Sequence, residues 1–289
     1  MNIKQKIESV GKPLKDWDIQ IYRGILTGFN EAFIIDGKTK DALIAKSPKS
    51  AEVIRPLLRG RDVKKWYPDY QNLWLIFIPW HFPLHGREDI AGNSEEANQA
   101  FQVQYPDLHT HLLHYKTELT NRNISETGIR YEWYALQRCA ATYYNEFDKP
   151  KIIYPNMTKH MPFIYDEIGY FTNDKGFIVT GKNLKYLTIL FNSNLFKYCF
   201  RDNFPELLGG TRELRKIFFD KIPIKTVTEN EEQEFNQLMD KITSKSHNIN
   251  ILEKEANDLI YKHYNLSKEE IAIIEQSKVL KETQYTENE

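Results

Sequence analysis

The stretch Trp17-Asp18-Ile19-Gln20-Ile21-Tyr22-Arg23-Gly24-Ile25-Leu26-Thr27-Gly28-Phe29-Asn30-Glu31-Ala32-Phe33-Ile34-Ile35-Asp36 decides how the rest of the chain is interpreted. Ile19 and Ile21 alternate with polar residues, which is typical of a half-buried strand. Residues 32–35 predict a second strand that pairs with the first. Glycines between them predict a loop, and polar side chains on a loop held between two rigid elements suit ligand binding. The candidate ligand-binding residues of this loop are Arg23, Thr27 and Asn30.

Composition places the chain among folded soluble proteins, with 41% hydrophobic and 27% charged residues in 289. The net charge of −1 argues against a generally basic nucleic-acid binder. Residues 226–289 contain 7 Lys and Arg against 14 Asp and Glu, which leaves 32 against 26 for residues 1–225. This asymmetry is consistent with a larger part that faces a polyanion, but on charge alone a helical tail with solvated acidic faces explains it better.

The apolar segments are short. The longest apolar run, residues 73–79, cannot span a bilayer, and no arginine-rich or apolar leader precedes the fold. We therefore expect a cytoplasmic protein with no membrane partner. Cys139 and Cys199 lack metal-type spacing and are expected to be reduced and buried.

A second candidate segment interleaves cations with aromatic residues. Residues 55–65 carry five cations, and Trp66, Tyr67 and Tyr70 follow closely, a combination suited to phosphates and exposed bases. The alternative is that Arg59 and Arg61 brace a turn through backbone carbonyls and nearby carboxylates. The candidate DNA-binding cations of this segment are Arg55, Arg59, Arg61, Lys64 and Lys65.

Two further segments supply candidate DNA-binding residues. Residues 129–134 are aromatic and partly cationic, and contribute Arg130 and Tyr131. Residues 209–216 form a glycine-hinged loop whose backbone can approach a ligand closely. The alternative for this loop is a plain turn before a strand over residues 218–224. Its candidate side chains are Thr211, Arg212 and Arg215.

The order of predicted elements indicates an α+β fold rather than a repeating βαβ fold. Ser47 and Pro48 predict a short helix that ends near Pro56, and Ser267 with Glu270 predicts the start of a final helix. Three histidines between residues 109 and 114 are expected to be exposed, because their spacing does not suit a metal site. The other predicted helices cover residues 3–10, 94–122, 184–200 and 229–264, the last broken near 244–248, and the predicted strands cover residues 73–78, 151–155, 163–165, 170–171 and 177–180.

No catalytic signature is convincing. The sequence has no Walker-type loop, dinucleotide fingerprint, HExxH, paired CxxC or nucleophile elbow. Asp202-Asn203-Phe204-Pro205 departs from the signature of amino-methyltransferases, since the second proline and the aromatic residue are absent. Asp166 and Glu167 could hold a divalent ion in a divergent nuclease, although a solvated turn explains them better.

Two motifs resemble those of a known family. They are Gly24-Ile25-Leu26-Thr27-Gly28-Phe29-Asn30-Glu31-Ala32-Phe33 and Ser50-Ala51-Glu52-Val53-Ile54-Arg55-Pro56-Leu57-Leu58-Arg59-Gly60-Arg61-Asp62. Both are similar to the TaqI-like C-terminal specificity domain of adenine-specific DNA methyltransferases and type IIG restriction-modification enzymes. The likeness continues, with Tyr105-Pro106, Trp133-Tyr134-Ala135-Leu136 and residues 259–271, over nearly the whole chain.

The resemblance implies a domain that selects the DNA sequence and has no catalytic site of its own. Its implied partners are double-stranded DNA and methyltransferase or endonuclease domains, in cis or in trans. It implies no cofactor in this chain, since S-adenosylmethionine and magnesium belong to the rest of such an enzyme. Two alternatives remain open: a stand-alone metal-dependent nuclease and a module that binds only protein.

The resemblance also divides the chain. Residues 1–16 are expected to be a helical connector from an upstream methyltransferase. Residues 17–225 are expected to be the DNA target recognition domain, with a twisted mixed or antiparallel sheet and flanking helices. Residues 226–289 are expected to form a C-terminal helical hairpin. Phosphate contacts are expected from residues 55–65, Arg212 and Arg215, and base contacts from residues 27–30 and 210–212.

Overall fold

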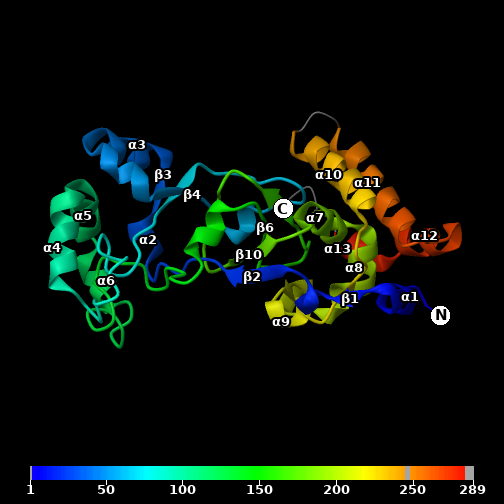
Figure 1. Ribbon diagram of the computed structural model, residues 1–289, viewed down its shortest axis with the longest axis horizontal. Helices are drawn as coiled ribbons and strands as arrows, with labels where there is room; N and C mark the ends of the chain where they lie inside the picture. The colour runs from blue at the N-terminus through cyan, green and yellow to red at the C-terminus, as the bar shows by residue number, and fades with distance from the viewer. Residues whose placement is uncertain (1, 245–247, 284–289) are drawn as a thin grey trace.

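The computed structural model describes residues 2–244 and 248–283. The molecule is elongated, with helices at both ends and a four-stranded antiparallel sheet between them (Figure 1). The sheet contains, in order across it, β2 (Ile19–Arg23), β10 (Gly176–Gly181), β6 (Lys151–Pro155) and β8 (Ile164–Asp166).

Side chains on the two faces of this sheet belong to different cores. One row across the strands, Ile21, Val179 and Ile152, packs into the core that includes the C-terminal helices. The next row places Ile178 beside Ile153, and these residues pack into the core of the other lobe. Because successive side chains of a strand point to opposite faces, one apolar run supplies both cores.

The lobe at the left of Figure 1 contains a second sheet and a group of helices. In this sheet β3 (Ile34–Asp36), β5 (Leu73–Ile76) and β4 (Ile54–Leu58) are antiparallel, and β9 (Phe171–Thr172) joins β4 in parallel. Short 3₁₀ helices, including η2 (Pro48–Val53) and η4 (Tyr144–Asp148), connect these elements. The helices of the lobe are α2 (Asn30–Phe33), α3 (Gly37–Lys46), α4 (Glu95–Gln104), α5 (Pro106–Leu113) and α6 (Lys116–Asn121).

Helices from both ends of the chain form the other lobe (Figure 1). Lys6 of the first helix donates to Glu270 at 2.7 Å, and Ile7 and Leu280 belong to the same core. The N-terminal helix is therefore part of the same packed unit as the C-terminal helices. These helices are α1 (Ile3–Val10), α7 (Leu184–Asn192), α8 (Asn194–Phe200), α10 (Glu229–Thr243), α11 (Ile249–His263), α12 (Lys268–Glu275) and α13 (Lys278–Thr283).

Small elements connect the lobes to the sheet. The remaining strands pair in two short antiparallel ladders, β1 (Lys12–Pro13) with β12 (Pro223–Ile224) and β7 (Met157–Thr158) with β11 (Arg212–Glu213). Helix α9 (Lys216–Phe219) and the 3₁₀ helices η1 (Leu14–Asp16), η3 (Gly60–Asp62), η5 (Arg201–Asn203) and η6 (Leu208–Gly210) complete the described elements.

The predicted α+β class with a mainly antiparallel sheet is confirmed, as are most of the predicted elements. The capping box of Ser267 and Glu270 forms, and both cysteines are free and buried. Part of the predicted helix break, residues 245–247, lies outside the described residues, as do residue 1 of the predicted connector and residues 284–289 of the predicted C-terminal region.

Three local predictions are wrong. Residues 32–35 are not one strand that answers β2, because α2 takes the first half and β3 pairs with β5, while β2 pairs with β10. Residues 218–224 are not one strand, because Phe218 and Phe219 end α9, a turn follows, and only Pro223–Ile224 form a strand. Ser47 gives no side-chain cap to η2, and Pro56 lies inside β4 rather than ending a helix. Short apolar runs do not distinguish a helical turn from a strand.

A buried ion pair holds two strands of the central sheet together. Lys151 Nζ lies 2.5 Å from Asp166 Oδ2 and also donates to the carbonyl of Phe147 at 2.6 Å. Asp166 accepts two backbone N–H groups as well, from Ile168 and Tyr170 at 3.0 Å each. Burial lowers the pKa of Lys151, and the charge and hydrogen bond of Asp166 act in the opposite direction.

Replacing Lys151 by alanine is expected to lower the free energy of unfolding by about 3–5 kcal/mol, because a buried carboxylate loses its cation. Urea unfolding of Lys151→Ala measures this loss. The control is Lys149→Ala, which removes an exposed lysine two residues away and should leave the unfolding midpoint nearly unchanged. Equal midpoints for the two variants would show that the buried pair contributes little.

Candidate nucleic-acid interface

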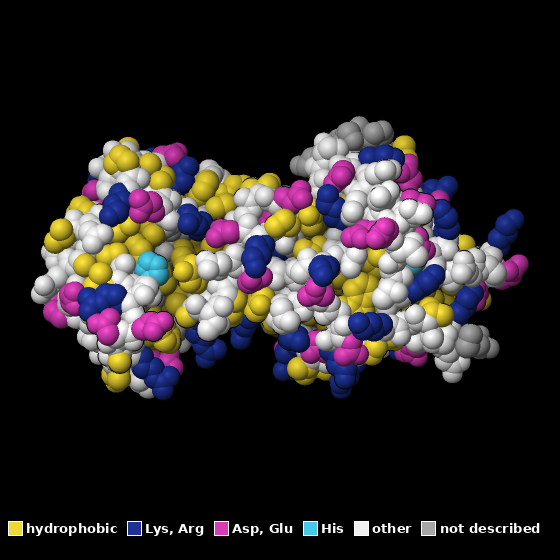
Figure 2. Space-filling view, viewed as in Figure 1, with side chains coloured by type: hydrophobic (Ala, Val, Ile, Leu, Met, Phe, Trp, Pro, Cys, Tyr) yellow, Lys and Arg dark blue, Asp and Glu magenta, His cyan; other side chains and the backbone are white. Residues whose placement is uncertain are grey.

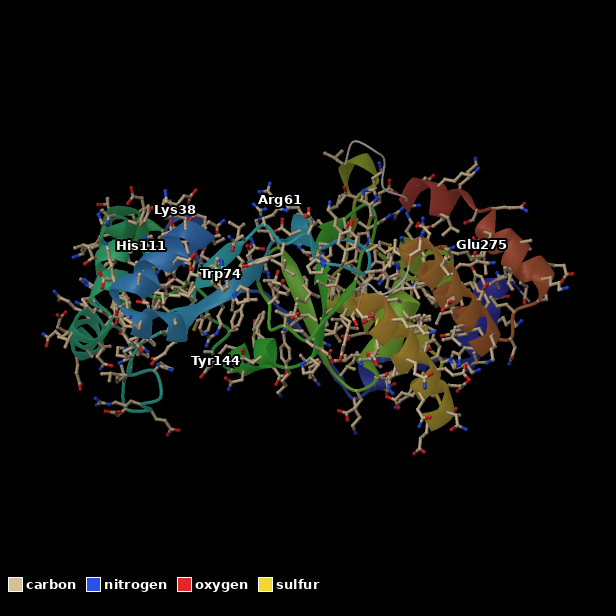
Figure 3. The ribbon with its side chains drawn as sticks, turned by 90° about the horizontal axis from the view of Figure 1, so that it is seen from above. Lys38, Arg61, Trp74, His111, Tyr144 and Glu275 are labelled. Carbon is tan, nitrogen blue, oxygen red and sulfur yellow. The ribbon has the colours of Figure 1, made fainter. Side chains whose placement is uncertain are left out.

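A cleft of about 680 Å³ opens beside the central sheet, where four loops meet. Its walls come from residues 59–64, 155–162, 173–175 and 209–211. In Figure 3 Arg61 lies at the upper edge, away from the face drawn in Figure 2. That face shows acidic and basic side chains interspersed (Figure 2). The lining residues are Arg59, Gly60, Arg61, Val63, Lys64, Pro155, Asn156, Met157, Thr158, Lys159, His160, Pro162, Asn173, Lys175, Gly209 and Thr211.

The charged side chains that line the cleft are all basic. Five Lys or Arg residues and one histidine line it, and none of its lining residues is Asp or Glu. Arg61 is exposed, and within residues 2–244 and 248–283 no carboxylate pairs with it. Lys175 is exposed and lies 3.2 Å from Asp174. A concave surface lined by one sign of charge concentrates counter-charges, and in a protein of net charge −1 this cleft is suited to a polyanion.

A rigid turn presents the first wall. The Arg59 guanidinium donates to both carboxylate oxygens of Asp62 at 2.8 Å, and the Arg59 backbone N–H donates to the same carboxylate at 2.8 Å. These bonds raise the pKa of Arg59 and fix the turn of η3. Gly60 leaves no room for a side chain, because a Cβ there would lie 2.9 Å from the carbonyl oxygen of Lys175.

Backbone hydrogen bonds join the other walls to each other. The N–H of Asn156 donates to the carbonyl of Lys175 at 2.8 Å, and the N–H of Leu214 donates to the carbonyl of Asn156 at 2.7 Å. Thr158 is paired with Arg212 in the β7–β11 ladder. Three segments that are distant in sequence are thus held in one register around the cleft.

The predicted site residues are only partly brought together. Four of them line the cleft: Arg59, Arg61, Lys64 and Thr211. Arg55 instead lines a second cavity with Tyr144, which Figure 3 shows at the opposite edge from Arg61. Arg130 lies in the far lobe and pairs with Glu126 at 3.6 Å. The remaining exposed candidates are Arg23, which donates to the carbonyl of Asp174 at 3.2 Å, Asn30, and Arg215, which pairs with Glu213 at 2.8 Å.

Burial argues against three of the predicted contacts. Tyr131 is fully buried and stacks on Trp80, with ring centroids 4.9 Å apart. Thr27 is buried, and its hydroxyl donates to Asn30 Oδ1 at 2.7 Å. Arg212 is buried and donates to Glu206 at 2.7 Å and to the carbonyl of Phe204 at 3.1 Å. In this conformation these side chains support the loops and have little surface for DNA.

Lys65 is also engaged within the fold. Its ammonium pairs with Glu253 of α11 and lies 5.7 Å from the centre of the Trp66 ring. The bracing role considered for Arg59 and Arg61 therefore holds for Arg59, through Asp62, and the cation cluster contains a second brace in Lys65. Arg61 carries the exposed charge of the turn.

Arg122, which sequence reasoning did not single out, holds the predicted loop near Thr27 in place. Arg122 donates to the carbonyl of Thr27 at 2.8 Å and to the carbonyl of Ala135. Burial lowers the pKa of Arg122 to about 10. The guanidinium lies 5.5 Å from the centre of the Phe33 ring and 5.6 Å from the centre of the Tyr131 ring. This loop is therefore rigid, although it is not part of the cleft.

Sequence reasoning missed six of the ten polar residues that line the cleft. Lys159 and His160 follow β7, and Asn173 and Lys175 lie between β9 and β10. The available signal was that cations stand in two loops between neighbouring strands, Asn156-Met157-Thr158-Lys159-His160 and Asn173-Asp174-Lys175. The pairing of those strands decides that the loops meet at one edge, and the pairing is not visible in the sequence.

The predicted acidic pair does not form a metal site. Asp166 is buried against Lys151, and its oxygens also accept the two N–H groups described above. Glu167 is exposed, and one oxygen accepts the hydroxyl of Tyr165 at 2.8 Å. Across the described residues, no group of three or more His, Cys, Asp or Glu could hold a metal ion. In the same part of the chain, no helix is long and apolar enough to cross a membrane.

The fold is an α+β domain in which loops at one edge of the central sheet line a cleft whose charged side chains are basic. The family of TaqI-like C-terminal specificity domains matches residues 55–224, more than half of the chain, and the chain belongs to this family. The match contains every lining residue of the cleft. A comparison with curated protein sequences finds no match.

Two solved structures with a similar fold are a restriction endonuclease and a restriction-modification enzyme. The type IIG restriction endonuclease BpuSI matches with a TM-score of 0.51 and 16% identity, over 91% of this chain and 33% of its own. The type IIL restriction-modification enzyme MmeI, solved in complex with DNA, matches with a TM-score of 0.55 and 12% identity, over 91% of this chain and 35% of its own. The chain thus spans about a third of the length of either enzyme.

Replacing Arg59 is expected to lower the stability of the protein, whereas replacing Arg61 is not. Arg59→Ala removes the guanidinium from the buried carboxylate of Asp62, which then keeps only the hydrogen bond from the backbone N–H of residue 59. This change should lower the free energy of unfolding by about 2 kcal/mol. Arg61→Ala should leave the unfolding midpoint in urea unchanged. A loss of equal size in both variants would contradict the bracing role of Arg59.

Proposed function

We propose that this chain is the sequence-specific double-stranded DNA recognition module of a restriction-modification enzyme that methylates adenine at N6. The observation that carries the proposal is the cleft, whose charged lining side chains are all basic, inside the region that matches the specificity-domain family. The DNA complex of MmeI, a protein of the same fold, supports it.

The cleft combines the two kinds of group that reading DNA requires. Its cations neutralise phosphates, which supplies affinity without sequence information. Its half-buried amide and hydroxyl groups, on Asn156 and Thr211, can donate to or accept from base edges. A duplex is too large to enter a cleft of about 680 Å³, so we infer that one backbone strand lies in it while the loops around it reach a groove.

The remaining parts of the proposal follow from the family. We propose that residues 17–225 read DNA, that residues 1–16 connect to a methyltransferase, and that residues 226–289 contact the rest of the enzyme. Methyltransferase and endonuclease domains, in cis or in trans, are the proposed protein partners. S-adenosylmethionine and magnesium are proposed to act only on those domains.

The nuclease alternative is disfavoured by the contacts of Asp166. A metal ligand needs free lone pairs, and this carboxylate is buried, paired with Lys151 and bonded to two backbone N–H groups. The alternative of a module that binds only protein predicts no affinity for DNA, and the first experiment separates it from the proposal.

That experiment is selection from a pool of random duplex DNA at low salt by the purified chain, with sequencing of the retained molecules. Enrichment of one short motif is the expected result and would name the recognition site. Retention without enrichment would support phosphate binding and contradict sequence reading by the isolated chain. No retention would favour the module that binds protein.

The salt dependence of DNA binding tests the cleft itself. Arg61→Gln and Lys175→Gln should each reduce the slope of log affinity against log salt by about 0.9, the value for one lost phosphate contact. Fluorescence anisotropy with a labelled duplex measures the slope. The matched control is Lys38→Gln, an exposed lysine on α3 in the far lobe (Figure 3), which should leave the slope unchanged. If both cleft variants showed the slope of the unchanged protein, the cleft would not be part of the DNA interface.

A further inference from the structure

A hairpin beside the cleft presents one fully exposed leucine. Residues 205–213 turn back on themselves, and the side chain of Leu208 at the tip is 97% exposed. It is the most exposed of the large hydrophobic side chains in the described residues, and Leu207 before it is also exposed. Single exposed apolar residues are ordinary, so a role for Leu208 has to be argued from its position beside the cleft.

The hairpin is held closed close to its tip. The N–H of Leu207 donates to the carbonyl of Thr211 at 2.7 Å, and the N–H of Glu213 donates to the carbonyl of Pro205 at 3.1 Å. Between these bonds Gly209 and Gly210 have φ of 72° and 78°, a conformation that favours glycine. The three residues of the tip therefore form a narrow turn in which leucine is the only side chain.

The base of the hairpin is fixed by the buried Arg212. Its guanidinium lies 2.7 Å from Glu206 and 3.1 Å from Asp202. The strand that leaves the tip, β11, is hydrogen-bonded to β7 in the wall of the cleft. The acidic groups near this strand are thus paired with arginines, Glu213 with Arg215 at 2.8 Å included, and oppose DNA less than free carboxylates would.

The tip lies next to the proposed path of DNA. Gly209 and Thr211, on either side of Gly210, line the cleft with Arg61 and Lys64. Leu208 directly precedes Gly209 of the cleft lining, so a strand whose phosphates occupied the cleft would pass close to this leucine. Proteins that distort a duplex insert an apolar side chain of this size between base steps, and narrow rigid tips achieve this with little loss of entropy.

We propose that Leu208 is a wedge that inserts between stacked bases of DNA bound in the basic cleft. The proposal rests on the proposed function, since it needs DNA in the cleft. It adds a distortion step: the cations hold the backbone, and the leucine occupies space that unstacking opens. Such a wedge favours DNA in which one stacking interaction is already missing.

The test compares two 30-base-pair duplexes that differ only in one central abasic site, titrated by anisotropy at low salt with the full chain. The unchanged protein should bind the abasic duplex about tenfold more tightly, because unstacking is part of the cost of binding intact DNA. Leu208→Ala should bind both duplexes equally, and Leu208→Met should keep the preference. 2-Aminopurine placed beside the abasic site reports the insertion as a change in fluorescence that Leu208→Ala loses.

A matched control is Val103→Ala, which shortens a side chain that is 79% exposed on α4 in the other lobe and should keep the preference. Equal binding of both duplexes by the unchanged protein would overturn the wedge and leave the proposed function standing. A preference that survives in Leu208→Ala would likewise overturn it. Absence of binding to either duplex would overturn the proposed function together with the wedge.

Discussion

The structure depends on a central sheet that is buried on both faces. The row Ile21, Val179 and Ile152 faces one core, while the adjacent pair Ile178 and Ile153 faces the other. Neither lobe can form without the strands that serve both, so the sheet couples them. The same constraint explains why Lys151, the first residue of β6, needs an internal partner: every residue of that strand is buried, and Asp166 on β8 supplies the paired carboxylate.

Much of the secondary structure was predictable because it depends on local chemistry. Capping by Ser267 and Glu270, the proline at the start of α5 and the alternation in β2 are visible in a few neighbouring residues. Strand pairing was not predictable. Residues 32–35 have the composition of a strand, yet the partner of β3 is β5, about forty residues away. The competition between a turn of helix and a strand there is decided by tertiary packing.

The cation cluster shows the same limit at the level of the site. Sequence reasoning found the right segment, residues 55–65, but could not sort its charges. Arg59 and Lys65 have carboxylate partners, Asp62 and Glu253, while Arg61 is exposed and lines the cleft. Asp62 is three residues from Arg59, so the sequence allowed a prediction of that ion pair. Glu253 lies 188 residues after Lys65, on α11, so nothing in the sequence indicated that these two residues pair.

The separation between supporting and presenting residues has a consequence for how such a chain can change. The side chains that hold the walls, such as Asp62 and Arg212, are buried, whereas Arg61, Lys175 and Leu208 are exposed on the turns between them. Substitutions at the exposed positions leave the two cores intact. The chemistry around the cleft can therefore change by exchanging a few residues in short loops while both cores stay packed. The frame keeps the shape of the cleft through such changes.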